Sequence, residues 1–385
     1  MTTTLRIAMN GVTGRMGYRQ HLVRSILPIR EQGGVRLEDG STVQVEPVIV
    51  GRNEDRLRQI ADDHGIESVS TDTDGCMEAD DVDIYFDAQS TSRRYDALTR
   101  AINAGKHIFT EKPTAETLEQ AVTLARLAKD KGITDGVVHD KLYLPGLVKL
   151  RHLVEQGFFG RMLSMRGEFG YWVWEGTDKP AQRPSWNYRT EDGGGITTDM
   201  FPHWNYVIEG IVGRITDVYA TTVTHIPERV DENGQTYKAT ADDAAYAIFS
   251  VETPAGDRVV VQLNSSWDVR VHRDELVEFQ VDGTGGSAVA GLRGCVTQAR
   301  GETPTPTWNP DLPDLNAYLT QWTPVTEAEL ENGFKLQWEE FIRDVVAGRK
   351  HRYDLLSGAR GVQLAELGLR SSAEGRRLDV PEITL

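Results

Sequence analysis

The sequence predicts an α/β protein of two domains: an amino-terminal parallel sheet covered by helices, and a carboxyl-terminal α+β domain with a large open, mainly antiparallel sheet. Over the first 140 residues, short apolar runs alternate with amphipathic stretches, the order that gives a parallel sheet with helices on both faces. After Pro145, long β-prone stretches separated by turn formers take over. The length of 385 residues also favours two domains, which we place at residues 1–141 and 142–385.

The elements of the first domain follow from these runs in order. The expected strands are Leu5–Met9, Pro47–Val50, Val82–Phe86, His107–Phe109 and Gly136–Val138. The expected helices between them are Tyr18–Leu27, Glu54–His64, Tyr95–Ala104 and Leu118–Lys131. Asp39-Gly40, flanked by β-prone residues, predicts a hairpin inserted over Gly33–Val45.

The second domain begins with an expected helix, Leu147–Glu155, and is then rich in strands. The expected strands are Met162–Trp174, Ile215–His225, Ala244–Val251, Val259–Trp267 and Leu276–Val281. A proline-rich stretch, Thr303–Pro313, is expected to be an irregular loop, and Phe334–Val346 and Leu355–Glu374 are expected to close the chain as helices.

The composition excludes several classes of partner. With 42 Lys and Arg against 58 Asp and Glu, the net charge of −16 disfavours nucleic-acid binding, which needs clustered cations, and an anionic membrane surface. No apolar run is long enough to span a bilayer. Only two cysteines occur, too few for a disulfide framework, and no cluster of metal ligands is apparent. We therefore expect a cytoplasmic protein without a metal site.

A glycine-rich turn follows the first strand. Asn10-Gly11-Val12-Thr13-Gly14-Arg15-Met16-Gly17 has the spacing Gly-x-x-Gly-x-x-Gly and opens a helix. In a dinucleotide-binding turn the first glycine permits the sharp bend, the second lets the backbone approach the pyrophosphate, and the third allows close helix–strand packing. This context predicts a Rossmann dinucleotide-binding domain with Gly11, Thr13, Gly14, Arg15 and Met16 at the cofactor. An ordinary turn is the alternative.

The end of the second strand bears on the choice of cofactor. The strand ends Val50-Gly51-Arg52-Asn53, without the carboxylate that accepts hydrogen bonds from the ribose of NAD. The planar fork of Arg52 suits a 2′-phosphate. The sequence therefore favours NADP, with NAD possible, and with Arg52 and Asn53 at the cofactor. The alternative is a solvated Arg52 and an Asn53 that only caps the next helix.

Two further motifs indicate catalysis. Glu111-Lys112-Pro113 follows a predicted strand directly, and Pro113 restricts Lys112 to an extended conformation at the edge where parallel sheets bind ligands. After Gly193-Gly194-Gly195, Asp199 and His203 are four residues apart and share a helix face. Because Pro202 is best tolerated in a first turn, we place the start of this helix near Asp199. Asp199 could then be a simple helix cap.

Together these motifs resemble the glucose–fructose oxidoreductase/inositol dehydrogenase (Gfo/Idh/MocA) family. The resemblance extends to Ala104-Gly105-Lys106-His107, to Gly157-Phe158-Phe159-Gly160 and to the Asp242-Asp243-Ala244 strand entry. It implies an NAD(P)-dependent oxidoreductase of sugars or cyclitols, with Lys112, Asp199 and His203 as catalytic residues and Glu111 and Lys112 at the cofactor. The sequence departs from the family at Phe201-Pro202 and at His139-Asp140-Lys141.

Physical chemistry suggests roles for the three catalytic candidates. A lysine has an ordinary pKa of about 10.4 and would need a drop of roughly three units to act as a base at neutral pH, whereas histidine starts near 6.5. Our hypothesis is that His203 is the acid/base, that Asp199 orients it and that Lys112 binds the reacting oxygen. A desolvated Lys112 acting as the base is the alternative.

Aromatic and polar residues between the two motifs suit a polyhydroxylated ring, which offers apolar faces and hydroxyl groups. The candidates for substrate contact are Lys141, Trp174, Trp186 and Tyr188. The aromatic residues along the predicted strand at Phe169–Trp174 could equally form a sheet face that contacts another subunit in a homodimer or homotetramer.

The leading prediction is an NADP-preferring oxidoreductase acting on a hydroxyl or keto carbon of a sugar, sugar derivative or cyclitol. One alternative is a glycoside hydrolase that keeps NAD bound and oxidises its substrate transiently. A second is a non-catalytic regulator that senses the cofactor.

Overall fold

The computed structural model describes residues 3–173, 176–305, 311, 318–326 and 331–385. Contacts between Cα atoms divide the chain into two compact units. The first comprises residues 1–143, 331–363 and 382–385, and the second comprises residues 144–330 and 364–381. The predicted domains instead assigned everything after residue 141 to the second domain. The difference arises because the chain returns to the first unit near residue 331.

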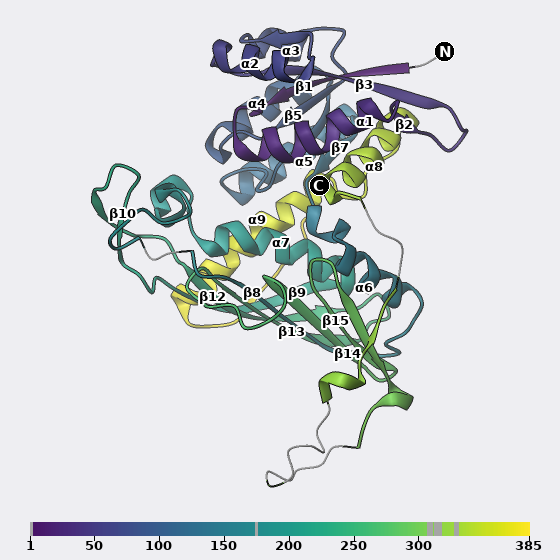
Figure 1. The fold of residues 1–385 in the computed structure, drawn as a ribbon, viewed down its shortest axis with the longest axis vertical. Helices are drawn as coiled ribbons and strands as arrows, with labels where there is room; N and C mark the ends of the chain where they lie inside the picture. Colours follow the sequence, from purple (N-terminus) through teal and green to yellow (C-terminus); the bar gives the residue numbers. More distant parts are fainter. Residues whose placement is uncertain (1–2, 174–175, 306–310, 312–317, 327–330) are drawn as a thin grey trace. The chain divides into compact units, whose positions relative to one another are not determined.

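The first unit is built on a seven-stranded sheet with the order β2-β3-β1-β5-β6-β7, and β4 pairs with β3 (Figure 1). All its pairings are parallel except that between β2 and β3. The strands are β1 (Thr3–Asn10), β2 (Val35–Arg36), β3 (Thr42–Val50), β4 (Ser68–Ser70), β5 (Ile84–Asp87), β6 (His107–Thr110) and β7 (Asp135–Val137). The parallel sheet and the inserted hairpin are thus confirmed.

Two apolar clusters lie on the two faces of this sheet, because successive residues of a strand point to opposite faces. Ile7, Phe86 and Phe109 belong to one cluster, and Ala8, Tyr85 and Ile108 to the other. The helices that contribute to the first cluster are η1 (Gly17–Ile26, a π-helical segment), α1 (Leu27–Glu31), α2 (Glu54–His64) and α8 (Gly333–Ala347). Those of the second are α3 (Thr73–Glu78), α4 (Thr91–Asn103), α5 (Leu118–Lys131) and the start of α9 (Leu355–Glu374).

Helix α8 is part of the first unit although it follows β7 by almost 200 residues. Trp338, Phe341 and Ile342 have no exposed surface and pack in the first cluster with Phe86 and Phe109. The chain thus completes the core of its first unit with a segment from near its end.

The second unit contains a nine-stranded sheet with the order β17-β16-β15-β14-β8-β13-β12-β9-β18, shown in Figure 1. All pairings along it are antiparallel except that between β8 and β13. Its strands are β8 (Met162–Gly170), β9 (Arg214–Val223), β12 (Ala244–Glu252), β13 (Arg258–Ser266), β14 (Val277–Gly283), β15 (Gly286–Ala290), β16 (Cys295–Ala299), β17 (Thr323–Pro324) and β18 (Leu378–Asp379). The large, mainly antiparallel sheet is confirmed.

The second unit also contains helices α6 (Pro145–Glu155) and α7 (Ile196–Ile211) and the part of α9 from residue 364 onward. A two-stranded sheet of β10 (Glu228–Val230) and β11 (Thr236–Lys238) and short 3-10 turns belong to it as well. Those turns are η3 (Ser185–Tyr188), η4 (Thr190–Asp192), η5 (Arg300–Glu302) and η7 (Tyr318–Gln321), while η2 (Asp140–Tyr143) belongs to the first unit. Within the described ranges, no helix has the length and apolarity needed to cross a membrane.

Candidate active site

The glycine turn after β1 depends on the absence of side chains. Gly11 has a φ of +94°, and a Cβ there would lie 2.5 Å from the carbonyl carbon of Ala88. A Cβ on Gly17 would lie 2.4 Å from the carbonyl oxygen of Gly11, so the helix can approach the turn this closely only at a glycine. Thr13, Gly14 and Arg15 are exposed at the helix start and Met16 is half-buried. Such a turn presents backbone N–H groups to an anion.

Arg52 and Asn53, the two residues after β3 that were predicted to contact the cofactor, differ in their surroundings. Arg52 is exposed. The side-chain oxygen of Asn53 accepts the backbone N–H of Arg56 at 3.0 Å and caps α2. The side-chain oxygen of Asn53 is thus engaged in the helix cap, whereas the Arg52 side chain is exposed.

The Glu111-Lys112-Pro113 turn directly follows β6 and is held by a buried arginine. Arg94 of α4 donates from Nε to Asp87 at 3.0 Å and from Nη2 to the carbonyl oxygen of Gln89 at 2.6 Å. Its Nη1 donates to the carbonyl oxygen of Pro113. Arg94 is 2% exposed and Asp87 is fully buried, so the bonds of Arg94 to Asp87 and Pro113 join the end of β5 to the turn after β6 inside the unit.

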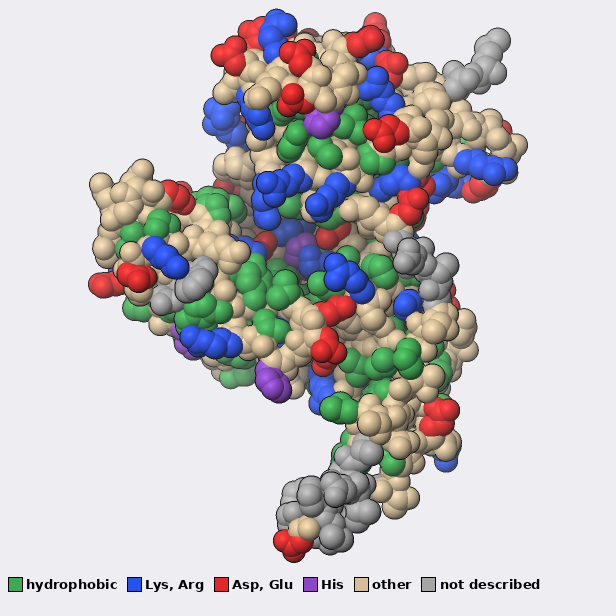
Figure 2. Space-filling view, viewed as in Figure 1, with side chains coloured by type: hydrophobic (Ala, Val, Ile, Leu, Met, Phe, Trp, Pro, Cys, Tyr) green, Lys and Arg blue, Asp and Glu red, His purple; other side chains and the backbone are tan. Residues whose placement is uncertain are grey.

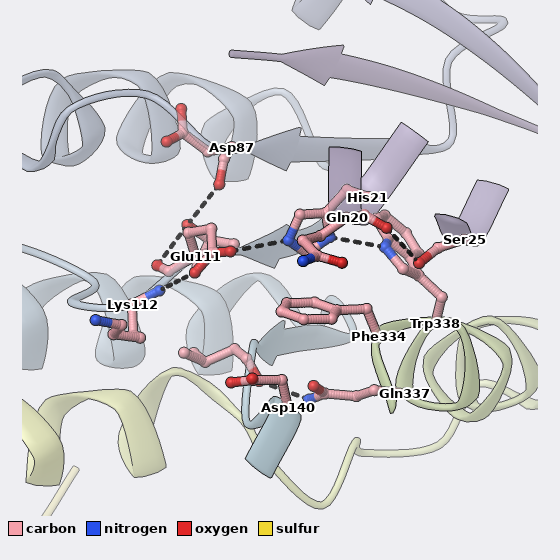
Figure 3. Close-up of polar contacts among 12 residues, drawn as sticks. Gln20, His21, Ser25, Asp87, Glu111, Lys112, Asp140, Phe334, Gln337 and Trp338 are labelled. Carbon is pink, nitrogen blue, oxygen red and sulfur yellow. Dashed lines mark hydrogen bonds and ion pairs between the residues drawn. The ribbon is translucent and has the colours of Figure 1, made fainter. Parts of the chain in front are cut away.

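Glu111 faces inward, as Figure 3 shows. Its Oε1 lies 2.9 Å from Nε2 of His21, and its Oε2 accepts the backbone N–H of Lys112 at 3.2 Å. Burial acts to raise the pKa of the Glu111 carboxyl, but the hydrogen bond from His21 and the neighbouring charges outweigh it and leave the pKa below its usual value. Glu111 is thus an ionised, 8% exposed anchor rather than a surface ligand.

Lys112 is half-buried, and the strand beside its own contributes further polar groups. Because β6 and β7 are parallel neighbours, Lys112 and His139-Asp140-Lys141 leave the sheet at the same edge. The ammonium of Lys141 lies 3.8 Å from the carboxylate of Asp140. His139 is buried, and this burial, reinforced by the charge of His351, holds its pKa well below the usual value.

Helix α7 carries the two predicted catalytic residues of the second unit, but it starts earlier than the sequence indicated. It begins at Ile196, so Pro202 lies inside the helix, and the predicted start near Asp199 is wrong. The cap comes from elsewhere in the chain, because the carboxylate of Asp242 accepts the backbone N–H of Thr197 at 3.0 Å and its hydroxyl at 2.5 Å. Asp199 is therefore not the cap.

Asp199 and His203 each have a specific partner in the second unit. Nη1 of Arg183 lies 3.0 Å from a carboxylate oxygen of Asp199. Nδ1 of His203 lies 2.6 Å from the hydroxyl of Tyr206, one helical turn further along α7. His203 is 6% exposed, which suits a group that transfers a proton out of contact with bulk water.

Arg183 contacts both the carboxylate of Asp199 and the aromatic ring of Trp267. Its guanidinium lies 4.3 Å from the centre of the Trp267 ring, and it also donates to the side-chain oxygen of Asn187 at 3.2 Å. The predicted substrate residues of this segment are aromatic and do not include Arg183. In the sequence, Arg183 stands out only as an arginine between two groups of aromatic residues, and this position does not indicate that it pairs with Asp199.

The four predicted substrate residues have different surroundings. Trp186 is 51% exposed, and Lys141 lies by Asp140 in the first unit. Tyr188 has no exposed surface, and the Arg229 guanidinium lies 3.9 Å from the centre of its ring. Trp174 lies outside the described residues.

One group of possible metal ligands occurs in the described part of the chain. Ligand atoms of Glu340, Asp344 and His351 lie within 4.8 Å of one another. A carboxylate oxygen of Asp344 accepts a hydrogen bond from Nδ1 of His351 at 2.8 Å, and Glu340 accepts one from the Tyr143 hydroxyl at 2.5 Å.

This chain is similar to known oxidoreductases over most of its length. The family model for the oxidoreductase family with an NAD-binding Rossmann fold (GFO/IDH/MocA) matches residues 5–139, and that for the GFO/IDH/MocA C-terminal domain matches residues 147–289. The D-xylose dehydrogenase of Paenarthrobacter nicotinovorans is 67% identical over 385 residues, which cover 100% of this chain and 99% of that protein. The levoglucosan dehydrogenase of Pseudarthrobacter phenanthrenivorans is 26% identical over 260 residues, or 64% of each chain.

Among solved structures, a levoglucosan dehydrogenase in complex with NADH has the same fold. Its TM-score is 0.81 at 22% identity, covering 99% of this chain and 100% of the other. The resemblance predicted from the motifs is confirmed by the two family models and by the full-length relative. The chain belongs to the GFO/IDH/MocA family of oxidoreductases and carries its NAD-binding Rossmann fold and its C-terminal domain.

Proposed function

We propose that this protein transfers hydride between a nicotinamide cofactor and a CH–OH carbon of a sugar, with D-xylose as the first substrate to test. The observation that carries the proposal is the Glu111-Lys112-Pro113 turn, held by Arg94 at the ligand-binding edge of an NAD-binding sheet. The 67% identity to a D-xylose dehydrogenase supports a sugar as the substrate.

The direct test is the initial rate of cofactor reduction at 340 nm. Purified protein is assayed with NAD or NADP against D-xylose, other aldoses, cyclitols and levoglucosan. We expect reduction with at least one aldose. Absence of reduction across the panel, with tight cofactor binding retained, would instead favour a cofactor-sensing protein.

Within this function we propose His203 as the acid/base, Asp199 as the group that orients it and Lys112 as the group that binds the reacting oxygen. The near-complete burial of His203 and its contact with Tyr206 support an oriented imidazole. His203→Ala should lower kcat by about a hundredfold or more, the usual scale for a general acid/base. His272→Ala, at an exposed histidine of the same unit, is the matched control. If Lys112→Met abolishes turnover while His203→Ala leaves it intact at all pH values, Lys112 is the base.

We propose NADP as the preferred cofactor, with Arg52 as the group that meets its 2′-phosphate. The exposed guanidinium at the end of β3 and the capping role of Asn53 support this assignment. Arg52→Ala should reduce kcat/KM for NADP by about tenfold or more while changing that for NAD little. Arg58→Ala, on the exposed face of α2, controls for a general loss of positive charge. Equal kcat/KM for the two cofactors in the unaltered protein would reject the preference.

We further propose a cytoplasmic homo-oligomer, a dimer or tetramer formed through the nine-stranded sheet. Large apolar side chains are exposed on adjacent strands of that sheet, and apolar groups are visible on the second unit in Figure 2. Those on the sheet are Leu163, Tyr219, Tyr246, Ile248 and Val260. Light scattering after size exclusion should give a multiple of 42.9 kDa, and Ile248→Glu should shift it toward one chain.

A further inference from the structure

Buried hydrogen bonds connect Glu111 to His21, and His21 to Trp338, two residues from parts of the first unit that are distant in sequence. His21 comes from η1, Glu111 from the end of β6 and Trp338 from α8 (Figure 3). His21 and Trp338 have no exposed surface. We propose that His21, held in one tautomer by Trp338, is a positioning residue for the reaction, because it anchors Glu111 and through it the backbone of Lys112. The proposal rests on the sugar oxidoreductase function.

The donors and acceptors along this line determine where the His21 proton lies. The indole Nε1 of Trp338 can only donate, and it lies 3.0 Å from Nδ1 of His21. Nδ1 must therefore accept, which places the imidazole proton on Nε2. Nε2–H then donates to the Glu111 carboxylate at 2.9 Å. The same tautomer satisfies both neighbours at once.

The surroundings of His21 make the arrangement rigid. Its ring centre lies 4.4 Å from that of Phe86 and 5.1 Å from that of Phe334, so aromatic rings exclude water from the imidazole. A buried carboxylate without a donor would carry a large desolvation cost. The His21 bond therefore stabilises the ionised Glu111 in one place.

Glu111 transmits this constraint to the residue beside it. With Oε1 held by His21, Oε2 accepts the backbone N–H of Lys112 at 3.2 Å. On the other side of Lys112, the carbonyl of Pro113 is held by Arg94. The backbone of Lys112 is thus fixed on both sides, which limits the positions that its ammonium can reach. Small misplacements of such a group are costly in rate.

The helix that carries His21 is irregular at this position. Residues 17–26 are π-helical, and the backbone N–H of Leu27 bonds the carbonyl oxygen of Leu22, five residues before it. Wide turns of this kind recur at functional sites. The irregular segment aims an imidazole at the Lys112 turn from the helix that also begins at the glycine loop.

The test compares two substitutions of His21. Gln offers an amide N–H to Glu111 and a carbonyl oxygen to Trp338, whereas Phe fills the space with neither group. We expect His21→Phe to lower kcat by about ten- to a hundredfold, the scale of a hydrogen bond to a charged group, and to leave the Kd for NADH or NADPH within about threefold. His21→Gln should stay within about threefold of the unaltered kcat.

The two substitutions also separate positioning from simple packing. A merely structural His21 would give a Phe variant with unaltered kcat, or Gln and Phe variants equally impaired, and either result would overturn the proposal. Thermal unfolding of each variant, read alongside kcat, shows whether a loss of rate accompanies a loss of fold.

A second measurement reads the tautomer in the unaltered protein and needs no turnover. In protein labelled with ¹⁵N at its 9 histidines, His21 should show a pyridine-type shift for Nδ1 and a pyrrole-type shift for Nε2. His21→Gln assigns the resonance. The opposite tautomer would overturn the proposal even in an active enzyme. If instead the tautomer is as expected and no sugar is oxidised, it is the proposed function that fails.

Discussion

Gly11 shows how one backbone conformation determines the start of the cofactor turn. Its φ of +94° is unfavourable for any other residue, and a Cβ would meet the backbone of Ala88 at 2.5 Å. Gly11→Ala should therefore destabilise the protein by about 1–3 kcal/mol and weaken cofactor binding. Gly40→Ala is the matched control, because Gly40 also has a positive φ, +84°, but no atom lies within 4 Å of a Cβ there. If Gly11→Ala and Gly40→Ala lower the unfolding temperature equally, the close approach to Ala88 does not contribute to the destabilisation.

The Asp87–Arg94 pair gives a second prediction for single residues. Arg94→Lys keeps the charge but cannot contact Asp87, Gln89 and Pro113 together. We expect the variant to lose about tenfold or more in kcat and to unfold at a lower temperature. Arg93→Lys, at the preceding exposed arginine, should change neither quantity. A fully active Arg94→Lys enzyme would show that Arg94 does not hold the Lys112 turn.

Sequence alone indicates candidate site residues only where the signal is local. Lys112 stands out because a strand precedes it and a proline follows it, and Asp199 and His203 because of their four-residue spacing. His21 and Arg94 could not be found in this way. The partners of His21 are 90 and 317 residues distant, and a single histidine on a helix resembles any buried histidine until the fold brings Glu111 and Trp338 to it.

At the scale of elements, strands with clear apolar runs were predicted, whereas boundaries that depend on tertiary contacts were not. β3 begins at Thr42 and contains Pro47, which was expected to start the strand. On the side away from β1, Pro47 lies between the residues paired with β2 and those paired with β4, where its missing N–H is tolerated. The start of α7 was misplaced for a similar reason, since its cap is Asp242, more than forty residues further on.

The start of α9 gives a prediction about pH. The carboxylate of Asp135 accepts the backbone N–H of Leu355 at 2.5 Å, but its burial raises its pKa to about 7. Between pH 4 and 7 the native state therefore keeps a proton that the unfolded state has lost, so the free energy of unfolding should fall as pH rises from about 4 to about 7 and level off above that.

The pKa of Asp135 is raised from the usual 3.8 to about 7, which limits the change in the free energy of unfolding with pH to at most about 4 kcal/mol. Asp135→Asn removes the titrating group and should flatten the dependence of the unfolding temperature between pH 5 and 8. Asp130→Asn, on the exposed surface of α5, is the control. An unchanged slope in Asp135→Asn would assign the pH dependence to other groups.

At the scale of the whole molecule, the first unit is assembled from separated parts of the chain. Residues 1–143 alone lack Trp338, Phe341 and Ile342, which are fully buried in its core. Truncating one such aromatic residue to alanine typically lowers the free energy of unfolding by about 3–5 kcal/mol, and the whole free energy of unfolding of a domain is about 5–15 kcal/mol. The fragment 1–143 should therefore fail to unfold cooperatively.

Joining residues 1–143 to residues 331–363 through a flexible linker should restore a cooperative transition, measured by circular dichroism on heating. The covalent link is reasonable because Tyr143 already hydrogen-bonds Glu340 at 2.5 Å within the unit. A cooperative transition of 1–143 alone at the midpoint of the joined fragment would show that α8 is dispensable for this fold.

The central claim, hydride transfer between a sugar carbon and nicotinamide, is tested most directly by isotope transfer. D-xylose deuterated at every carbon-bound position is incubated with the enzyme and oxidised cofactor, and the reduced cofactor is analysed by mass spectrometry. We expect one deuterium on the nicotinamide ring with the unaltered enzyme and about a hundredfold less deuterated cofactor in the same time with His203→Ala. Reduced cofactor without deuterium, or no reduced cofactor at all, would contradict the central claim.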